Sequence, residues 1–303
     1  MIHWTGIGDE AGTPLDAQIK ATLALGWQHL ELRNAEVPGY PAGNVHDLPE
    51  PAFDLLVETL AAAGITASGL GSTIGNWASH ITDPFEQTLE RVERAIPRLQ
   101  RLGARHIRVM SYAIRKQEDG SDHPDQMAQE RFRRLREIKQ RFDDAGLIMV
   151  HENCMNYGGM SISRALETLE NVPGLQWVFD TCNPLFNEDR DNPGHQQDPW
   201  AFYQAVKPSI AHIHIKDGIY LPEKKDCQYT LPGQGHGQVH RILTDLLSTG
   251  YQGYVSIEPY TAVVFHSSSE PSTLDPAAKA REQYDSYVAY GRELMQLMAS
   301  SPA

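Results

Sequence analysis

The stretch Ala145-Gly146-Leu147-Ile148-Met149-Val150-His151-Glu152 contains the pattern that decides the fold of this chain. A segment with helical periodicity ends at a glycine, and a short apolar run follows at once and closes on a charged residue. Glycine is favoured just after a helix because it readily adopts the left-handed conformation that turns the chain. The same helix end recurs at Leu25-Gly26-Trp27, Ala63-Gly64-Ile65, Leu102-Gly103-Ala104, Pro173-Gly174-Leu175 and Thr249-Gly250-Tyr251.

These helix ends, with a proline-terminated one near Val206–Ser209, divide the chain into repeats of helix and strand. The apolar runs predict strands at Ile2–Ile7, His29–Leu32, Thr66–Leu70, His106–Val109, Ile148–Glu152, Trp177–Phe179, Ile210–His214 and Tyr254–Ile257. Helices are expected between them, for example at Leu15–Leu25, Pro51–Ala63, Phe85–Leu102, Asp125–Ala145 and Pro276–Met298. Several runs are continuously apolar, which is typical of parallel strands buried on both faces.

Eight alternating units in 303 residues indicate an α/β protein with the (β/α)₈ TIM-barrel fold. We expect a single domain spanning residues 1–303. An open doubly wound sheet is disfavoured because Ile7-Gly8-Asp9-Glu10 lacks the GxGxxG spacing of a dinucleotide loop. Segments 183–198 and 218–237 are expected as insertions on the active face, where they would form walls or a lid. Ser267–Ser272 is expected to be a surface excursion.

The composition argues against several classes of partner. A net charge of −13 at pH 7 disfavours a protein that grips a phosphate backbone, so no nucleic-acid partner is expected. No apolar stretch approaches the ~18 residues that a membrane helix needs, and Met1-Ile2-His3-Trp4 lacks the pattern of a secretory signal. Cys154, Cys182 and Cys227 show no CxxC spacing. We therefore expect a cytoplasmic protein with reduced thiols and no membrane partner.

Four polar residues stand where four successive predicted strands end, namely Glu152, Asp180, His214 and Glu258. The carboxyl ends of barrel strands meet at one mouth, where three carboxylates would repel one another and be partly desolvated. Any one of them alone would be interpreted as a strand cap or a surface ion pair. Together they predict one divalent metal ion, and such a ligand set suits Mn²⁺, Mg²⁺, Co²⁺ or Zn²⁺. We favour manganese, Mn²⁺.

The motifs around these residues are Val150-His151-Glu152-Asn153, Phe179-Asp180-Thr181, His212-Ile213-His214-Ile215-Lys216-Asp217 and Gly250-Tyr251-Gln252-Gly253-Tyr254-Val255-Ser256-Ile257-Glu258. In these motifs the chain resembles the xylose-isomerase-like, sugar phosphate isomerase/epimerase superfamily. The resemblance covers the whole chain in strand order, and the last two motifs are quite specific. It implies that Glu152, Asp180, His214 and Glu258 hold a metal after the fifth, sixth, seventh and eighth strands.

The resemblance also implies proton abstraction from a carbon beside a carbonyl. In the family a metal ion stabilises an enediolate, and a carboxylate takes the proton and returns it to another carbon or to the other face. By resemblance, Glu152 and Glu258 lie on opposite sides of the sugar and act as acid and base. Lys216 is expected to bind a substrate oxygen, with a salt bridge to Asp217 or Glu258 as the alternative.

Further polar residues fall in loops on the active face. Asn183, Glu10 and His236 are the remaining candidates for substrate binding. Arg33 is interpreted either as a binding residue for an anionic group or as the ion-pair partner of Glu31 or Glu36.

One departure from the family narrows the function. Ketohexose epimerases and apurinic endonucleases of this superfamily usually carry a histidine where this chain has Asn183. The segment Gly233-Gln234-Gly235-His236-Gly237 also lacks the extra histidines of a three-zinc cluster. The resemblance therefore argues against DNA repair and weakens assignment to the ketohexose 3-epimerases.

The sequence thus predicts a divalent-metal-dependent isomerase or epimerase of a sugar, keto-sugar or cyclitol derivative, acting through an enediolate. The alternative is a lyase, decarboxylase or deglycosylase that uses the same site on a 3-keto-sugar derivative. A catalytically silent sugar-binding barrel is a third hypothesis. The expected partner is a small-molecule carbohydrate, and a homo-oligomer stays open because barrels of this family commonly associate.

Overall fold

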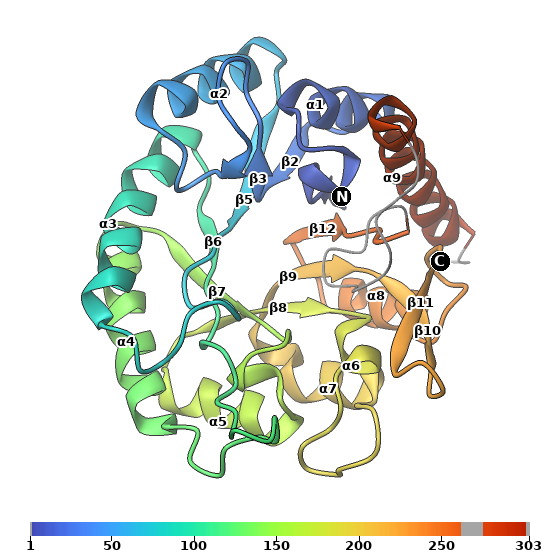
Figure 1. Ribbon diagram of the computed structural model, residues 1–303. Helices are drawn as coiled ribbons and strands as arrows, with labels where there is room; N and C mark the ends of the chain where they lie inside the picture. The colour runs from blue at the N-terminus through green and yellow to red at the C-terminus, as the bar shows by residue number, and fades with distance from the viewer. Residues whose placement is uncertain (1, 262–274, 301–303) are drawn as a thin grey trace.

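Eight parallel strands form one sheet that curls into a barrel, with the helices outside it (Figure 1). The computed structural model describes residues 2–261 and 275–300. Around the barrel the strands follow in chain order, and the parallel bridge between Ile7 and Glu31 joins the β1 and β2 edges. The bounds are β1 His3–Gly6, β2 His29–Leu32, β5 Thr66–Gly71, β6 His106–Arg108, β7 Ile148–Glu152, β8 Gln176–Asp180, β9 Ile210–Ile215 and β12 Tyr254–Ile257. The predicted TIM-barrel fold is confirmed, and each barrel strand ends within one residue of its expected position.

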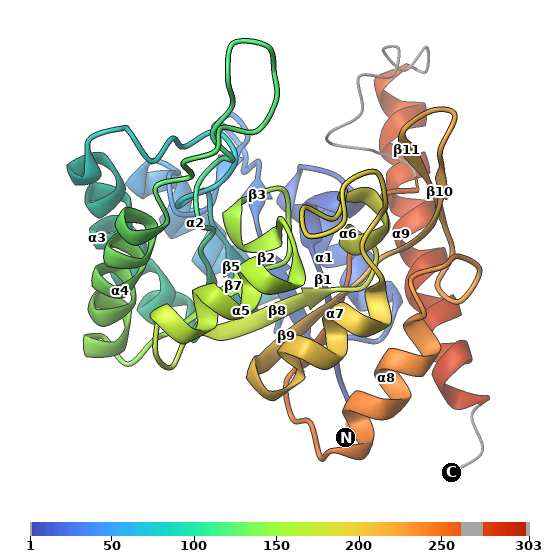
Figure 2. The same cartoon turned by 90° about the horizontal axis from the view of Figure 1, so that it is seen from below.

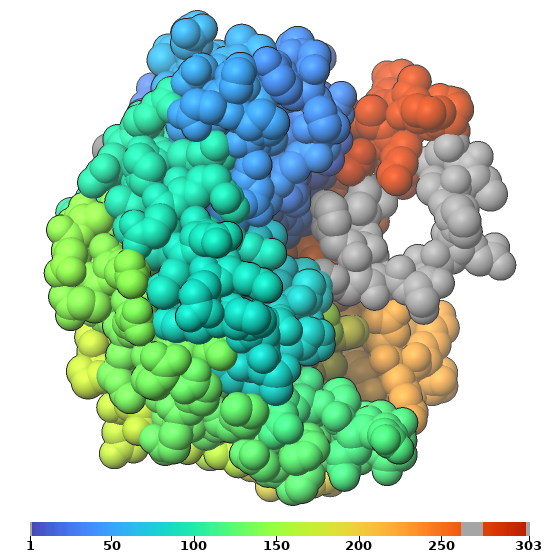
Figure 3. All heavy atoms as spheres, turned by 60° about the vertical axis from the view of Figure 1, so that its left-hand side comes forward, coloured from blue at the N-terminus to red at the C-terminus, as the bar shows by residue number. Residues whose placement is uncertain are grey.

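Helices connect the strands, and α2 to α5 form most of the surface visible from their side of the molecule (Figure 3). The helices are α1 Leu15–Ala24, α2 Glu50–Ala62, α3 Phe85–Leu102, α4 Ala128–Asp144, α5 Ile162–Asn171, α6 Asn183–Phe186, α7 Pro199–Val206, α8 Val239–Ser248 and α9 Pro276–Ala299. Short 3₁₀ helices lie at Gly8–Ala11, Tyr157–Gly159 and Lys207–Ser209, and two-residue strands β3 (Asn34–Ala35) and β4 (Gly43–Asn44) pair with each other. Among the residues described, no helix is both long and apolar enough to span a membrane.

The helices end where the glycine pattern places them. Gly103 follows α3 with a φ of 66°, and Gly146 follows α4 with a φ of 73°. A residue with a side chain would pay roughly 1–2 kcal/mol for this left-handed conformation, so glycine favours a chain reversal at both points. The reversal directs the chain into β6 and β7.

The apolar core lies between the sheet and the helices. Phe53 and Phe132 belong to one buried cluster, and Phe202 and Tyr287 belong to a second. Polar side chains meet inside the barrel instead. Thr5 on β1 and Ser68 on β5 are 3.1 Å apart through their hydroxyl oxygens, although these strands are not neighbours in the sheet.

The two segments expected as insertions both follow strand ends. Residues 183–198 begin with the short helix α6, and the second segment contains the antiparallel strands β10 (Asp217–Leu221) and β11 (Asp226–Thr230). This hairpin projects at the same end of the molecule as the segment between β6 and α4 (Figure 2). The excursion expected at Ser267–Ser272 lies outside the described residues.

The side chain of Asp217 explains the glycines of the second segment. Its carboxylate accepts hydrogen bonds from the backbone N–H groups of Gly233, Gly235 and Gly237 at 2.9, 3.0 and 2.8 Å. A Cβ atom at Gly235 would lie 2.4 Å from Asp217 Oδ1, so a larger residue does not fit there. We call this arrangement the Asp217 clamp. It fixes the base of the hairpin directly after β9.

Candidate metal centre

The four residues at the predicted strand ends converge on one point at the mouth of the barrel. Glu152, Asp180, His214 and Glu258 each offer a ligand atom, and these atoms all lie within 4.8 Å of one another. All four side chains are buried. The structure thus brings together the complete set that the sequence pattern selected, as a group that could hold a metal ion.

The register of the sheet places these side chains. Asp180 on β8 pairs with His214 on β9, and the N–H of Glu258 donates to the carbonyl oxygen of Ile215 at 3.0 Å. Asp180 Oδ1 accepts hydrogen bonds from the backbone N–H groups of Cys182 and Asn183 at 2.8 and 2.6 Å. One carboxylate oxygen is therefore committed to the turn into α6, and Oδ2 stays available to the site.

An arginine holds Glu152 from the side of β6. Arg108 Nη1 donates to Glu152 Oε2 at 2.8 Å, and His214 Nδ1 lies 3.1 Å from Glu152 Oε1. Burial alone would raise the pKa of Glu152, but Arg108 and His214 outweigh it and the pKa lies below its ordinary value. Glu152 is consequently a carboxylate at neutral pH.

Two further cations pair with Glu258, on the other side of the site from Arg108. Arg33 Nη1 donates to Glu258 Oε1 at 3.3 Å, and Lys216 Nζ donates to Glu258 Oε2 at 3.1 Å. Burial opposes ionisation here too, yet Lys216, His214 and Arg33 together lower the pKa of Glu258. Of the two salt-bridge partners considered for Lys216, Glu258 is the one that it contacts. The Asp217 carboxylate instead accepts the hydrogen bonds of the clamp.

Arg33 corrects one expectation from the sequence. Its side chain pairs with Asp9 and Glu10, with 3.0 Å from Nε to Asp9 Oδ1 and 2.6 Å from Nη2 to Glu10 Oε1. Pairing with Glu31 or Glu36 was the wrong alternative, because Glu31 points into the barrel. Burial raises the pKa of Glu10 to about 8 despite the neighbouring Arg33.

Glu31 is a polar residue of the barrel interior. Its carboxylate lies 3.0 Å from His214 Nε2 and 2.8 Å from His212 Nε2, and it accepts a hydrogen bond from Ser256 Oγ at 2.5 Å. Burial raises the pKa of Glu31, but the two histidines reverse the shift and leave the pKa well below its ordinary value. Glu31, His212 and His214 also have the geometry of a cation group. Each histidine already hydrogen-bonds to the Glu31 carboxylate, so we assign Glu31 to orienting His214.

The mouth of the barrel is crowded with acidic side chains. Five buried carboxyl groups, Asp9, Glu10, Glu152, Asp180 and Glu258, meet there with Arg33, Arg108, Lys216 and His214. Burial raises the pKa of Asp180 to about 7, with Glu258 and Glu152 adding to the effect and Lys216 opposing it. Asp180 Oδ2 is buried and accepts no well-aligned hydrogen bond within the described residues, although Lys216 Nζ lies 3.0 Å away. These features fit a divalent cation.

The other predicted site residues separate into three groups. Lys216 and Asn183 line a small pocket beside Glu152 and Glu258, and Asn183 Nδ2 donates to Glu152 Oε1 at 3.4 Å. Glu10 lies behind Arg33 and does not line this pocket. His236 is exposed and is not among the described residues that line the pocket. The structure therefore does not bring His236 to the site.

Two residues of the site were missed in the sequence. Arg108 closes β6 in the structure as Glu152 closes β7, but in the sequence the apolar residues Val109 and Met110 follow it, so the expected strand ran past it. Glu31 is a charged residue inside the apolar run His29–Leu32, and a charge at such a position needs a buried partner.

The sequence and the fold together identify the family. A family model described as xylose isomerase-like TIM barrel matches residues 19–287, and the chain belongs to this family. No curated protein sequence gives a significant match.

Solved structures share the fold at low sequence identity. A xylose isomerase-like TIM barrel protein from Mycobacterium smegmatis in complex with magnesium has a TM-score of 0.65 and 17% identity, over 98% of this chain and 97% of that one. The 3-keto-D-glucoside 4-epimerase YcjR from E. coli has a TM-score of 0.63 and 18% identity, over 99% and 100%. The IolI protein with a bound zinc atom has a TM-score of 0.68 and 14% identity, over 99% of each chain.

Proposed function

We propose that this protein is a divalent-metal-dependent isomerase or epimerase of a sugar, keto-sugar or cyclitol derivative. The observation that carries the proposal is the convergence of Glu152, Asp180, His214 and Glu258 within 4.8 Å at the mouth of the barrel. The similarity in fold to a 3-keto-D-glucoside epimerase supports a carbohydrate substrate.

These four side chains would hold the ion, and Mn²⁺ is the ion we favour over Mg²⁺, Co²⁺ and Zn²⁺. A bound divalent ion would supply positive charge to the substrate oxygens while an enediolate develops. The magnesium and zinc in the two related structures support a divalent ion without selecting one.

The two glutamates are our candidates for acid and base. They enter the pocket from β7 and from the end of β12, which are separated in the sheet by β8 and β9. Arg108 is the main cation that keeps Glu152 ionised, and Lys216, with His214 and Arg33, keeps Glu258 ionised. One carboxylate removes a proton from one face of a substrate carbon, and the other glutamate, once it has taken up a proton from solvent, delivers it to the opposite face. Lys216 and Asn183 are placed to bind substrate oxygens.

Solvent deuterium tests the proposal. Protein loaded with Mn²⁺ is incubated in D₂O with a panel of ketoses and 3-keto-sugars, and products are followed by NMR and mass spectrometry. We expect an isomer or epimer that carries deuterium beside the carbonyl. Glu152→Gln and Glu258→Gln should each slow its formation by about 10²–10⁴-fold, whereas the exposed Glu170→Gln should not. An isomer formed without solvent deuterium, or at an equal rate in all three variants, would contradict the mechanism.

A second candidate is bond cleavage in a 3-keto-sugar derivative with the same residues. It is favoured by a large chamber next to the pocket, which could receive a leaving group. In the same experiment, release of a free aglycone or of carbon dioxide in place of an isomer would select this alternative.

A further inference from the structure

The pocket beside the two glutamates is very small. Its volume is about 30 Å³, and about 10–15 Å³ of such space is enough for one water molecule. A complete sugar ring does not fit into this space alone. The part of a substrate that does not react must therefore lie outside the pocket.

A second cavity, the outer chamber, adjoins it directly. Trp77, Met155 and Phe186 line both spaces, so the two form one path from the surface to the glutamates. The volume of the outer chamber is about 570 Å³, within the roughly 300–1,000 Å³ typical of small-molecule sites. This space is much larger than the reacting part of the substrate requires.

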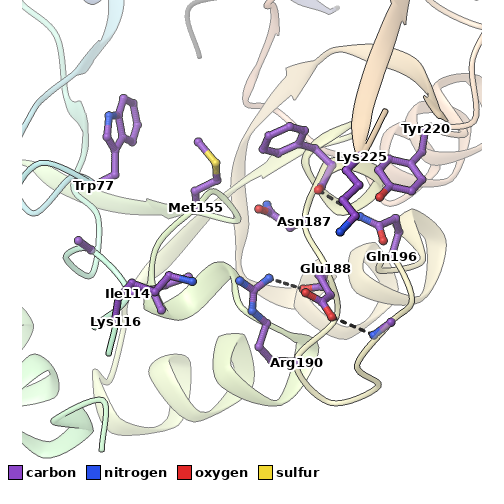
Figure 4. A pocket seen from close by; sticks show the side chains of 13 residues that line it. Trp77, Ile114, Lys116, Met155, Asn187, Glu188, Arg190, Gln196, Tyr220 and Lys225 are labelled. Carbon is purple, nitrogen blue, oxygen red and sulfur yellow. Dashed lines mark hydrogen bonds between the residues drawn. The ribbon is translucent and has the colours of Figure 1, made fainter. Parts of the chain in front are cut away.

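Flat apolar faces stand on opposite sides of the outer chamber. Figure 4 shows Trp77 on one side and Tyr220 on the other, with Met155 between them and Ile114 below. Trp77 is 37% exposed, which makes it one of three large exposed hydrophobic residues in the described part of the chain. Aromatic faces of this kind bind the flat face of a ring by stacking.

The charges of the outer chamber are largely compensated within the protein. Lys116 and Arg190 both form ion pairs with Asp122, with 3.0 Å from Arg190 Nε to Asp122 Oδ2. Lys225 adds a cation at the exposed hairpin tip, and Glu188 adds an acid. The other polar lining comes from amide groups such as Asn187 and Gln196. Because Lys116 and Arg190 are already paired with Asp122 and Lys225 lies at the exposed tip, the surface left for a ligand is mainly aromatic and amide, which suits a neutral, hydroxylated group.

We propose that the outer chamber binds a second, neutral ring of the substrate. The substrates are then conjugates, in which the sugar that reacts at Glu152 and Glu258 carries a glycosyl or an aryl group. This inference rests on the proposed function for its chemical step. It names the class of substrate, which the metal centre by itself does not determine.

Binding tests the chamber without any turnover. The probes are phenyl β-D-glucoside and cellobiose, with glucose as the short reference, and affinities are measured by calorimetry on the Mn²⁺-loaded protein. The second ring should tighten binding about tenfold, and the better of the two probes identifies an aryl or a glycosyl occupant. Ile114→Trp, which fills the chamber, and Tyr220→Ala, which removes one face, should each abolish this gain. The exposed Leu166→Ala on α5 serves as the control.

Turnover then separates this inference from the proposed function. The ratio of kcat/KM for 3-keto-glucosides to that for 3-keto-glucose should fall about tenfold in Ile114→Trp. Equal binding of short and conjugated probes in the wild-type protein overturns the chamber assignment, even if 3-keto-glucose is epimerised. A tenfold binding gain that both chamber variants lose supports the chamber, even if no sugar in the panel reacts and the proposed function fails.

Discussion

Glu31 on β2 holds the ring of His214 on β9 from across the barrel, with 3.0 Å between Glu31 Oε1 and His214 Nε2. Because the histidines keep the pKa of Glu31 low, its carboxylate accepts and Nε2 carries the proton. The other ring nitrogen, Nδ1, faces Glu152 at 3.1 Å. Without a metal ion, Glu31 and Glu152 outweigh burial and raise the pKa of His214 well above its ordinary value, so both ring nitrogens carry protons. A divalent ion bound at Nδ1 would displace that proton and leave the Nε2 proton on Glu31, as in histidine ligands oriented by a carboxylate.

Replacement of Glu31 should therefore weaken metal binding although this residue is not one of the four ligands. We expect Glu31→Gln to lower the affinity for Mn²⁺ by about 10–100-fold, as measured by calorimetry. The exposed Glu36→Gln, on the same segment, is the matched control. An affinity unchanged within twofold in Glu31→Gln would show that the buried contact does not position the ligand.

Asp180→Asn should separate metal binding from the stability of the metal-free protein. Mn²⁺ at about 1,000 times its dissociation constant should raise the Tm of the wild-type protein by roughly 5–10 °C. In Asp180→Asn this rise should disappear. The metal-free variant should be at least as stable as the metal-free wild type, because one of the repelling carboxylates is neutral. Thermal melts with EDTA and with Mn²⁺ measure both effects, and a retained metal-dependent rise would contradict the assignment.

Acidification should destabilise the protein through buried neutral histidines. Burial lowers the pKa of His46 to about 4, and the Thr73 N–H donates to its Nε2 at 3.1 Å. The unfolded chain binds a proton below the ordinary value of about 6.5, whereas the folded protein does so only near 4. Stability therefore falls as the pH drops from about 6.5 to 4, by roughly 1 kcal/mol per unit once His46 is protonated in the unfolded state.

Urea titrations at several pH values measure this slope. In His46→Gln the free energy of unfolding should fall less steeply as the pH drops, by up to the equivalent of one bound proton. The exposed His80→Gln should retain the wild-type slope. Equal slopes in all three proteins would assign the acid sensitivity to other groups.

Loss of the Asp217 clamp should release the base of the hairpin. Asp217→Ala leaves the N–H groups of Gly233, Gly235 and Gly237 without their acceptor, at a cost of about 1–3 kcal/mol for each that stays buried. We expect a lower free energy of unfolding and faster hydrogen exchange at these three amides. Asp226→Ala, at the far end of the hairpin, removes only a local bond to the Cys227 N–H and should leave their exchange slow.

The features that could be predicted from the sequence are those set by residues close together in the chain. Glu152 and Glu258 could be assigned to the site because each closes its own apolar run, and parallel strands bring such ends together. Contacts between strands that are far apart in the chain leave no pattern in the local sequence, so they could not be predicted from it. Glu31 and His214 are 183 positions apart, and Arg108 lies 44 positions before Glu152, so their pairing required the barrel to be closed.

The position of His236 away from the pocket has a different cause. Its place among glycines after a strand was typical of a binding loop. In the structure these glycines close on Asp217, and the N–H of His236 donates to the carbonyl oxygen of Gly218 at 2.8 Å. The segment serves the clamp, and its histidine is left exposed. A glycine-rich segment thus predicted a close approach of the backbone but not the group that it approaches.

The Asp217 clamp also divides the hairpin into parts that can change independently. Its base is tied to the strand that carries His214, whereas Pro222, Glu223 and Lys224 at the tip are exposed. Exchanging or lengthening the tip should alter the outer rim without disturbing the candidate metal centre. The hairpin tip of this chain is therefore a grafting point at which protein engineering can introduce new specificities while the metal centre stays unchanged.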